Sequence, residues 1–217
     1  MSRSYRLMCP IARALDRIGD RWTLLILRDL YAGPMRFGEI RSGLPGLATN
    51  LLTTRLNQLV VDGLAVKRGG VYSLTELGRR SSGVLWELAQ LGLGFPADPD
   101  IKQPGHLRLV AVTMEKAMTP VVGDEPDLVA ELVLDGESFT LRLEGGTLSV
   151  RYGAPDSPDV VAVSSYVPFM GAAGGEISMG EFLAGHLSVS GQDTSVVQLS
   201  RMMGRTMVES FGVSMGE

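Results

Sequence analysis

The pattern of apolar and polar positions in the first 94 residues predicts a helix-rich domain that ends in a β-hairpin and one more helix. Apolar residues recur at helical spacing, and glycine and proline interrupt the pattern at 33–34 and 43–46. Short alternating runs flank Arg68 and the two glycines after it, which is a hairpin signal. The expected helices are 9–18, 22–31, 36–42, 49–59 and 75–91, and the expected strands are 64–67 and 71–74.

The segment 49–59 is the most informative of these because its two faces differ in chemistry. Leu52, Leu56 and Leu59 recur on one side. The other side carries only hydroxyl, amide and guanidinium groups, from Thr49, Asn50, Thr53, Thr54, Arg55 and Asn57. On this helix no acidic residue occurs before Asp62. A helix with an apolar back and such a front is suited to lie against DNA.

Beyond residue 92 the pattern changes from helical to alternating. The stretch 92–100 is rich in glycine, proline and acid, which is typical of a boundary. Period-two alternation then predicts strands, and helical spacing returns near the C-terminus. The expected strands are 128–134, 139–143, 148–152 and 159–164, and the expected helices are 167–173, 178–184 and 196–208. This order indicates an α+β domain.

Charge divides at the same boundary. Residues 1–94 hold 13 Lys and Arg against 7 Asp and Glu, a net charge of +6, whereas residues 95–217 hold 7 against 17, a net charge of −10. A basic half joined to an acidic half indicates that the first half meets a polyanion. Cys9 is the only cysteine, which excludes an intramolecular disulfide. We find no signal peptide and no apolar run of membrane-spanning length, so we expect a cytoplasmic protein without a membrane partner.

The first half resembles the HxlR family of winged-helix transcription regulators, which belong to the broader MarR-like group. The resemblance covers about residues 7–93. It is carried by CPI at 9–11, GDRWTLLILRDL at 19–30, GPMRFGEI at 33–40, LLTTRL at 51–56, DGL at 62–64 and YSLTELG at 72–78. It implies a homodimer that binds palindromic double-stranded DNA, with each recognition helix in a major groove and the half-sites roughly 34 Å apart.

Mapped onto this chain, the resemblance implies two groups of DNA contacts. Thr49, Asn50, Thr53 and Thr54 would face bases or phosphates, and Arg36, Arg55, Lys67 and Arg68 would contact phosphates. The wing is shorter than is usual in the family, because two glycines reduce it nearly to a bare turn. Members of the family also sense oxidants through a cysteine at the position of Cys9, so a thiol-based sensor is a second hypothesis. A winged helix used only for protein contacts or dimerisation is a further alternative.

The second half carries no grouping typical of catalysis. Neither His106 nor His186 has acidic or cysteine neighbours at ligand spacing, so we expect no metal, no cofactor and no enzyme. AELVLDG at 130–136 and ISMGEFLAGHLSVSGQ at 177–192 resemble sterol-carrier-protein-type lipid-binding domains. That resemblance implies a curved sheet with helices on one side around an apolar tunnel, and a small-residue strand before the last helix. The candidate lining residues are Tyr152, Tyr166, Phe169, Met170, Phe182, Leu183, Met203 and Met207.

The sequence therefore predicts an α+β chain with a winged helix-turn-helix domain at 1–94, a linker at 95–103 and a sterol-carrier-like domain at 104–217. We expect a dimeric transcription regulator, in the first instance a repressor, that binds DNA and responds to an apolar small molecule. The alternatives are a lipid or isoprenoid carrier that its winged helix dimerises, and a redox regulator acting through Cys9.

Overall fold

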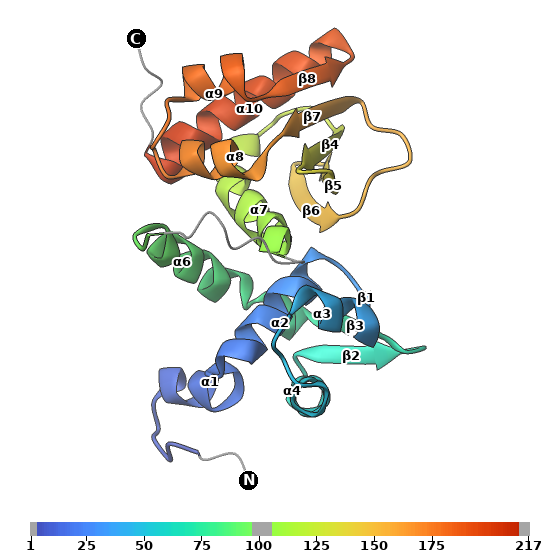
Figure 1. Ribbon diagram of the computed structural model, residues 1–217, viewed down its shortest axis with the longest axis vertical. Helices are drawn as coiled ribbons and strands as arrows, with labels where there is room; N and C mark the ends of the chain where they lie inside the picture. Colours follow the sequence, from blue (N-terminus) through green and yellow to red (C-terminus); the bar gives the residue numbers. More distant parts are fainter. Residues whose placement is uncertain (1–3, 97–105, 213–217) are drawn as a thin grey trace. The chain divides into compact units, whose positions relative to one another are not determined.

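The computed structural model describes residues 4–96 and 106–212, which form two compact units (Figure 1). The first unit holds the described residues up to 88 together with 106–109. The second holds residues 89–96 and 110–212. Most of the expected linker, 95–103, lies outside the described residues, so the two units are described separately.

The first unit has the hairpin and the first four helices that the sequence predicts. Its elements are α1 (Pro10–Ile18), α2 (Arg21–Ala32), β1 (Met35–Arg36), α3 (Phe37–Gly43), α4 (Thr49–Val61), β2 (Ala65–Arg68), β3 (Val71–Leu74), α5 (Glu76–Arg79), the start of α6 (Ser82–Leu93) and the short 3-10 helix η1 (His106–Arg108). The strands form an antiparallel sheet in the order β1-β3-β2. The two-residue strand β1 and the turn η1 are additions that the sequence pattern did not predict.

Helix α2 is the centre of this unit. Asp20 begins it as an N-cap whose carboxylate accepts hydrogen bonds from the main-chain N–H groups of Trp22 and Thr23. Its residues from Ile26 onward are mostly buried, and it packs against α3, α4, β3 and η1. The buried central helix expected at 22–31 is thereby confirmed, and it forms the support behind α3 and α4.

The prediction of a single helix at 75–91 is wrong, because this part of the chain forms two helices, α5 and α6. Thr75 caps α5 by accepting a hydrogen bond from the main-chain N–H of Gly78. The hydroxyl of Ser81 then donates to the carbonyl of Gly78 at 2.7 Å and competes with the helical ladder at that point. Gly78 also packs tightly on the chain before β2, since a Cβ there would lie 1.9 Å from the carbonyl oxygen of Leu64.

The second unit is a five-stranded mixed sheet with helices, as the α+β expectation required. Its elements are α7 (Leu109–Val122), β4 (Leu128–Leu134), β5 (Glu137–Glu144), β6 (Thr147–Tyr152), β7 (Val160–Ser164), α8 (Tyr166–Ala173), α9 (Met179–Gly185), β8 (Ser188–Gly191) and α10 (Asp193–Phe211). The strand order is β6-β5-β4-β7-β8, with β4 and β7 parallel and the other pairs antiparallel. The glycine turns at 135–136 and 145–146 join the hairpins in left-handed backbone conformations.

Alternation along the strands places one set of residues in the core. In β4, Leu128, Ala130, Leu132 and Leu134 are buried, and the residues between them are half-buried. Helix α10 packs against β7, β8 and α8, and α8 packs against α9. The small-residue strand before the last helix, implied by the sterol-carrier resemblance, is present as β8.

Helix α7 is not among the sequence predictions. Most of its residues are buried, among them Val110, Ala117 and Val121 with no exposed surface, so it has no broad polar face to reveal a helical period. Pro120 in its last turn also argues against a helix when only local preferences are read. Among the described residues, no helix is both long and apolar enough to cross a membrane.

Candidate nucleic-acid interface

Helix α4 has the two faces that the sequence predicts for a recognition helix. Leu52, Leu56 and Leu59 are at most 1% exposed and pack into the unit. The opposite face is fully available to solvent, with Thr49, Asn50, Thr53 and Thr54 all exposed. Two of the hydroxyls donate to the carbonyl four residues earlier, at 2.9 Å in each case. These bonds hold the hydroxyls close to the helix surface, where the oxygen atoms can still accept hydrogen bonds from a partner.

The N-terminal end of α4 has the properties of an anion-binding end. Ala48 occupies the N-cap and provides no side-chain cap, and the first turn holds no acidic residue. Asn50 uses its own Oδ1 to accept the main-chain N–H of Leu51 at 2.8 Å. Apart from the N–H of Leu51, the first N–H groups of α4 therefore lack the usual N-cap oxygen, and such groups attract phosphate.

The wing brings two of the predicted phosphate contacts into one row. Arg36 of β1 pairs with Val71 of β3, and Val71 pairs on its other side with Arg68 of β2. Residues paired in this way point to the same face of the sheet, so the guanidinium groups of Arg36 and Arg68 project from the same face. Arg36, Lys67 and Arg68 are all exposed, and Lys67 lies over the ring of Tyr72 at 5.0 Å. The sheet therefore places Arg36 and Arg68 on one face, whereas Lys67, which pairs with Tyr72, points to the other face.

Arg55 behaves differently from the other predicted phosphate contacts. Its Nη2 lies 3.1 Å from a carboxylate oxygen of Asp20, and both side chains are about one third exposed. Its Nε is buried without a hydrogen-bond partner. Since Asp20 is the N-cap of α2, Arg55 ties the recognition helix to the central helix. The structure thus places Arg55 away from the exposed row that carries Thr49, Asn50 and Thr53.

A second ion pair holds the other end of the recognition helix. Arg17 of α1 lies 3.0 Å from Asp62, which directly follows α4 and whose side chain is 6% exposed. Asp20, Arg17 and Asp62 were not among the sequence-predicted site residues. No local pattern identifies them, because each ion pair joins residues far apart in the sequence.

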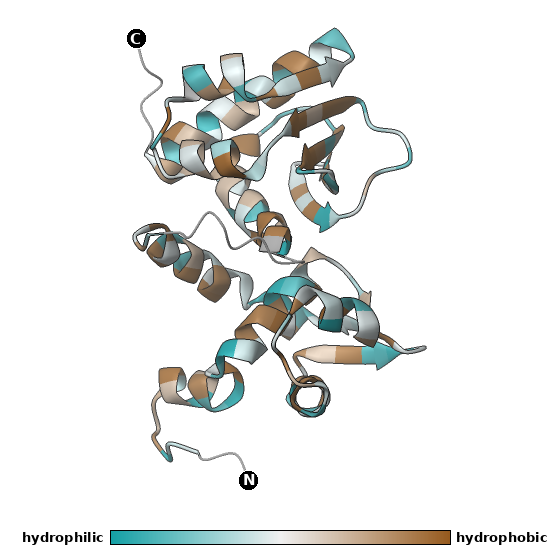
Figure 2. Cartoon of the chain, in the orientation of Figure 1, coloured by the Kyte–Doolittle hydropathy of each residue, from teal (hydrophilic) through white to brown (hydrophobic). Residues whose placement is uncertain are grey.

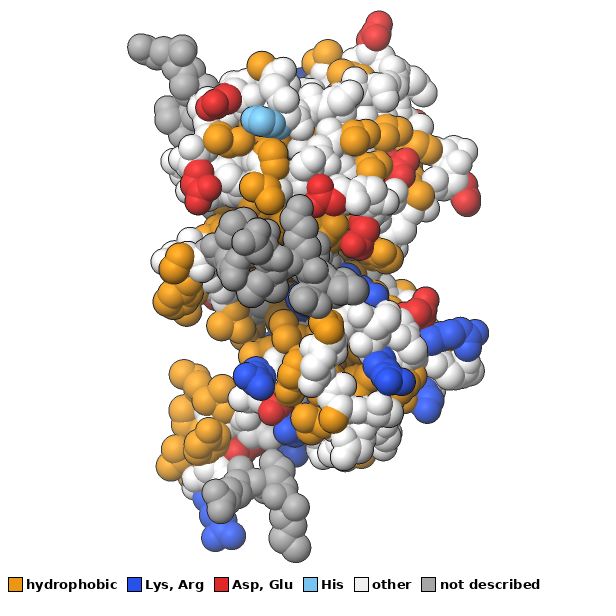
Figure 3. All heavy atoms as spheres, in the orientation of Figure 1, with side chains coloured by type: hydrophobic (Ala, Val, Ile, Leu, Met, Phe, Trp, Pro, Cys, Tyr) orange, Lys and Arg blue, Asp and Glu red, His pale blue; other side chains and the backbone are white. Residues whose placement is uncertain are grey.

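Two helices of the chain expose apolar residues in helical register. On α1, Ile11 and Leu15 are exposed one turn apart, and Met8 before the helix is fully exposed. On α6, Val84, Leu88 and Leu91 are exposed along one face. Figure 2 shows α6 as strongly hydrophobic, and Figure 3 shows hydrophobic side chains gathered over both helices. Apolar faces of this extent are typical of protein interfaces.

The candidate ligand residues of the second unit lie mostly on three helices that pack together. Tyr166, Phe169 and Met170 are on α8, Phe182 and Leu183 on α9, and Met203 and Met207 on α10. The rings of Phe169 and Phe182 meet edge to face with centroids 6.3 Å apart. Tyr152 lies apart from this group, on the edge strand β6, where it packs on Phe139.

The remaining candidate site is Cys9, which is exposed at the N-cap of α1. Within the described residues, no group of three or more His, Cys, Asp or Glu side chains could hold a metal ion. The side chain of His106 lies outside what is described, and His186 follows α9, where its carbonyl accepts from Ser164.

The comparisons with known proteins agree with this geometry. The HxlR-like helix-turn-helix family matches residues 17–98. An uncharacterized HTH-type transcriptional regulator of Synechocystis, sll1512, is 36% identical over 92 residues, which is 39% of this chain and 68% of that protein. The HTH-type transcriptional regulator YvaP of Bacillus subtilis is also 36% identical over 92 residues, covering 38% of this chain and 84% of that protein.

For the second unit, a similar solved structure is palmitated SCP2L2 from Aedes aegypti. It shares 19% identity, covers 41% of this chain and 86% of that one, and has a TM-score of 0.34. A TM-score below 0.5 does not establish a shared fold, so the α+β description of the second unit rests on its own strands and helices. For the first unit, the family match, the two relatives and the exposed recognition helix agree. The chain belongs to the HxlR-like helix-turn-helix family, and the matched relatives are named as HTH-type transcriptional regulators.

Proposed function

We propose that the protein is a dimeric repressor that binds palindromic DNA through α4 and the wing and that responds to an apolar small molecule held by its second unit. The observation that carries the DNA part is the geometry of α4. Thr49, Asn50 and Thr53 are exposed on one side, while the leucines on the other side are buried. The amide of Asn50 suits base edges in a major groove, and the hydroxyls suit bases or phosphates.

The wing supports the same proposal by supplying phosphate contacts. Arg36 on β1 and Lys67 and Arg68 on β2 are exposed on the two outer strands of the small sheet. Figure 3 shows Lys and Arg side chains over the elements of the first unit and Asp and Glu side chains prominent over the second. A positive unit gains affinity for DNA by releasing counterions.

A second copy of this chain is the proposed partner of the apolar faces on α1 and α6. Burying residues such as Ile11, Leu88 and Leu91 against identical residues of a partner would remove them from water. A two-fold dimer presents two recognition helices to two half-sites, and this is the reason to expect a palindromic operator.

An apolar ligand is proposed for the helices α8, α9 and α10. Helix α8 contains no charged residue, and Val167 on it is more than half exposed. Met170 and Leu183 are half-buried beside the fully packed Phe169 and Phe182. Half-buried methionine and leucine beside aromatic rings give an adaptable apolar surface. Tyr152 is omitted from this proposed surface because it lies on β6.

A mobility-shift titration with the promoter fragment of the protein's own coding region tests the DNA part. Asn50→Ala and Thr53→Ala should each weaken binding to this fragment by about 1–3 kcal/mol and leave the fold intact. Val197→Ala, on the exposed side of α10, is the matched control and should bind normally. Absence of binding by the wild type at low salt would refute the DNA part and favour a carrier that its winged helix only dimerises.

Palmitate and a polar control, glucose, test the ligand part. Native mass spectrometry should show one palmitate per chain and no bound glucose. Leu183→Asp should abolish palmitate binding while DNA binding persists, because a carboxylate is costly on an apolar surface. Failure of the wild type to bind palmitate would contradict the proposed ligand class.

A second candidate function is a thiol sensor, which the exposure of Cys9 favours. A thiol at this position is accessible to oxidants or electrophiles, and a disulfide could form only with another chain. Under this hypothesis, diamide or a quinone should reduce DNA binding by the wild type and leave Cys9→Ser unaffected. An equal effect on both proteins would exclude Cys9 as the sensor.

A further inference from the structure

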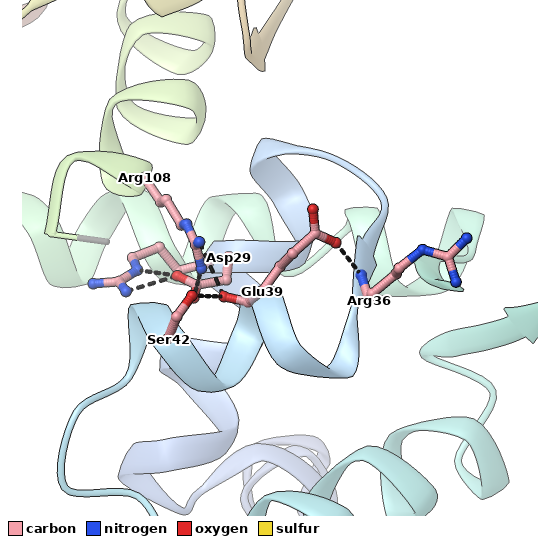
Figure 4. A network of polar contacts seen from close by, with 6 residues as sticks. Asp29, Arg36, Glu39, Ser42 and Arg108 are labelled. Atoms are coloured by element: carbon pink, nitrogen blue, oxygen red, sulfur yellow. Dashed lines mark hydrogen bonds and ion pairs between the residues drawn. The ribbon is translucent and has the colours of Figure 1, made fainter. Parts of the chain in front are cut away.

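A buried network of polar contacts joins α2 and α3 to Arg108, the last residue before α7 (Figure 4). Arg108 donates from Nη1 to Asp29 at 2.7 Å and from Nη2 to the main-chain carbonyl of Glu39 at 3.1 Å. Asp29 lies on α2 and has no exposed surface, and Glu39 lies on α3. One guanidinium group therefore connects α2 to α3.

Helix α3 is fitted closely around this guanidinium. A Cβ at Gly43, the last residue of α3, would lie 2.1 Å from Nη1 of Arg108, so a larger residue there would displace the guanidinium. The hydroxyl of Ser42 donates to the same Glu39 carbonyl at 2.9 Å. The carboxylate of Glu39 accepts the main-chain N–H of Arg36, the N-cap of the helix. A displacement of Arg108 would therefore act on the whole length of α3.

Asp29 does not depend on Arg108 alone for a charged partner. Arg28, its neighbour on α2, donates from Nε at 2.9 Å and from Nη2 at 2.6 Å to the other carboxylate oxygen. Burial raises the pKa of the Asp29 carboxyl, and the Arg28 and Arg108 guanidiniums act in the opposite direction. What Arg108 adds beyond charge compensation is the bond to α3.

The position of Arg108 in the sequence connects it to the second unit. It lies beyond the family match, which ends at residue 98, and the chain continues from it directly into α7. In α7, Glu115 accepts hydrogen bonds from the main-chain N–H of Val150 in β6 and from Arg151, each at 3.0 Å. The carbonyl of Ala117 accepts from Ser210 of α10, the helix that carries Met203 and Met207.

We infer that Arg108 is a positioning residue through which the ligand state of the second unit acts on the helix-turn-helix. This inference rests on the proposed ligand response. A ligand that moves α10 or β6 changes the bonds that hold α7, and the first turn of α7 carries Arg108 with it. Because Gly43 packs directly against the guanidinium and the Glu39 carbonyl accepts from it, a displacement of Arg108 either moves α3 or breaks this bond. Two arrangements that differ in DNA affinity are what a ligand needs in order to regulate binding.

Three full-length variants separate this role from simple stabilisation. Arg108→Met removes both the charge and the bond to α3. Arg108→Lys keeps a charge beside Asp29 but lacks the planar fork that reaches two acceptors at once. Arg28→Met is the matched control. Arg28 also donates to Asp29, but within the part of the chain that the structure describes it has no hydrogen bond to α3.

The measurement is the apparent Kd for the promoter fragment with and without palmitate. In the wild type and in Arg28→Met, palmitate should change this Kd by about fivefold or more. In Arg108→Met and Arg108→Lys the change should fall below about twofold, although palmitate still binds at one per chain. Hydrogen exchange at the amides of Glu39–Gly43 should rise in both Arg108 variants and stay unchanged in Arg28→Met.

The outcomes distinguish this inference from the proposal on which it rests. An equal palmitate effect in the wild type and in the Arg108 variants overturns the inference and leaves the ligand response intact. If palmitate does not bind, or binds without changing the wild-type Kd for DNA, the proposed ligand response is refuted. The inference about Arg108 then fails with it. If Arg108→Met does not fold, Arg108→Lys provides the same comparison.

Discussion

Arg17 of α1 and Asp62 at the end of α4 form an ion pair with 3.0 Å between nitrogen and oxygen. Arg17 is more than half exposed, whereas the Asp62 side chain is almost fully buried. A carboxylate at the C-terminal end of a helix also faces the negative end of the helix dipole. Asp62 is therefore costly without a cation, and Arg17 fixes the recognition helix to a helix that we propose as part of the dimer interface.

Arg17→Ala should lower the free energy of unfolding of the first unit by about 1–3 kcal/mol, because it leaves a buried carboxylate unpaired. Both tryptophans, Trp22 and Trp86, lie in this unit, so their fluorescence in a urea titration reports its unfolding. Arg13→Ala is the control, since Arg13 is exposed on the same helix and makes no ion pair among the described residues. Equal losses in both variants would show that the pair contributes nothing specific.

Substitution of Arg55 and of Arg68 by alanine should have different effects on the salt dependence of DNA binding. Arg68→Ala removes a proposed phosphate contact and should reduce the slope of log K against log salt by about 0.9. Arg55→Ala should leave the slope unchanged and instead destabilise the first unit by about 1 kcal/mol, because Arg55 holds α4 to the N-cap of α2. The titrations use the promoter fragment at several salt concentrations. If both substitutions reduce the slope equally, Arg55 contacts a phosphate, as the sequence predicts.

Two glycines near the start of α6 should respond to alanine in opposite directions. Gly78→Ala places a Cβ against the Leu64 carbonyl and should destabilise the first unit by about 1–3 kcal/mol. Gly83 lies inside α6 with no atom within 4 Å of the added Cβ, so Gly83→Ala should stabilise by about 0.5–1 kcal/mol. Urea titration followed by tryptophan fluorescence checks both. A stable Gly78→Ala protein would contradict the close packing of α5 on the chain before β2.

The sequence pattern predicts elements well where the controlling interactions are local. Helix α4 begins at Thr49 as expected, since the spacing of its leucines sets both its face and its length. The hairpin forms around Gly69 and Gly70, both in the left-handed region. The same reasoning failed at Ser81, where one side-chain hydrogen bond divides a helix that the apolar spacing shows as continuous.

The interactions that orient the site are not local, and this is why the sequence did not reveal them. Asp29 and Arg108 are 79 positions apart, and Asp20 and Arg55 are 35 apart. A charged residue in a helical pattern is typical of a solvent-exposed face, so the pattern does not indicate that Asp29 is buried. Periodicity alone likewise does not show that Asp20 lies beside Arg55, and the phosphate contact of Arg55 stays a prediction.

The apolar faces of α1 and α6 predict a dimer that a single charge would disrupt. Leu88→Glu should give a monomer in sedimentation equilibrium at concentrations where the wild type is a dimer, because a buried carboxylate without a partner is costly. Operator binding should fall at least tenfold, since one half-site provides only part of the contacts. Val197→Glu adds the same charge at an exposed position of α10, and this variant should remain a dimer. A dimeric Leu88→Glu protein would exclude this face of α6 from the interface.

The loss of stability in Arg108→Met should grow as pH rises. Burial already raises the pKa of Asp29 above its ordinary value of 3.8, so between that value and the raised one the folded chain holds more protons than the unfolded chain. In that window stability falls with increasing pH. Removing Arg108 takes away one cation that lowers this pKa, and the fall should extend to higher pH.

At neutral pH, where Asp29 has lost the Arg108 charge, Arg108→Met should be about 3 kcal/mol less stable than the wild type. Below pH 3.8 the carboxyl is protonated in both proteins, so the ion-pair part of the difference disappears and the gap should shrink. Urea titrations followed by Trp22 and Trp86 fluorescence at a series of pH values measure the gap. The double variant Asp29→Asn with Arg108→Met has no titrating group at position 29 and should differ from Asp29→Asn by an amount independent of pH. A gap between Arg108→Met and the wild type that stays constant from acid to neutral pH would mean that the Asp29 carboxylate gains nothing from the Arg108 charge.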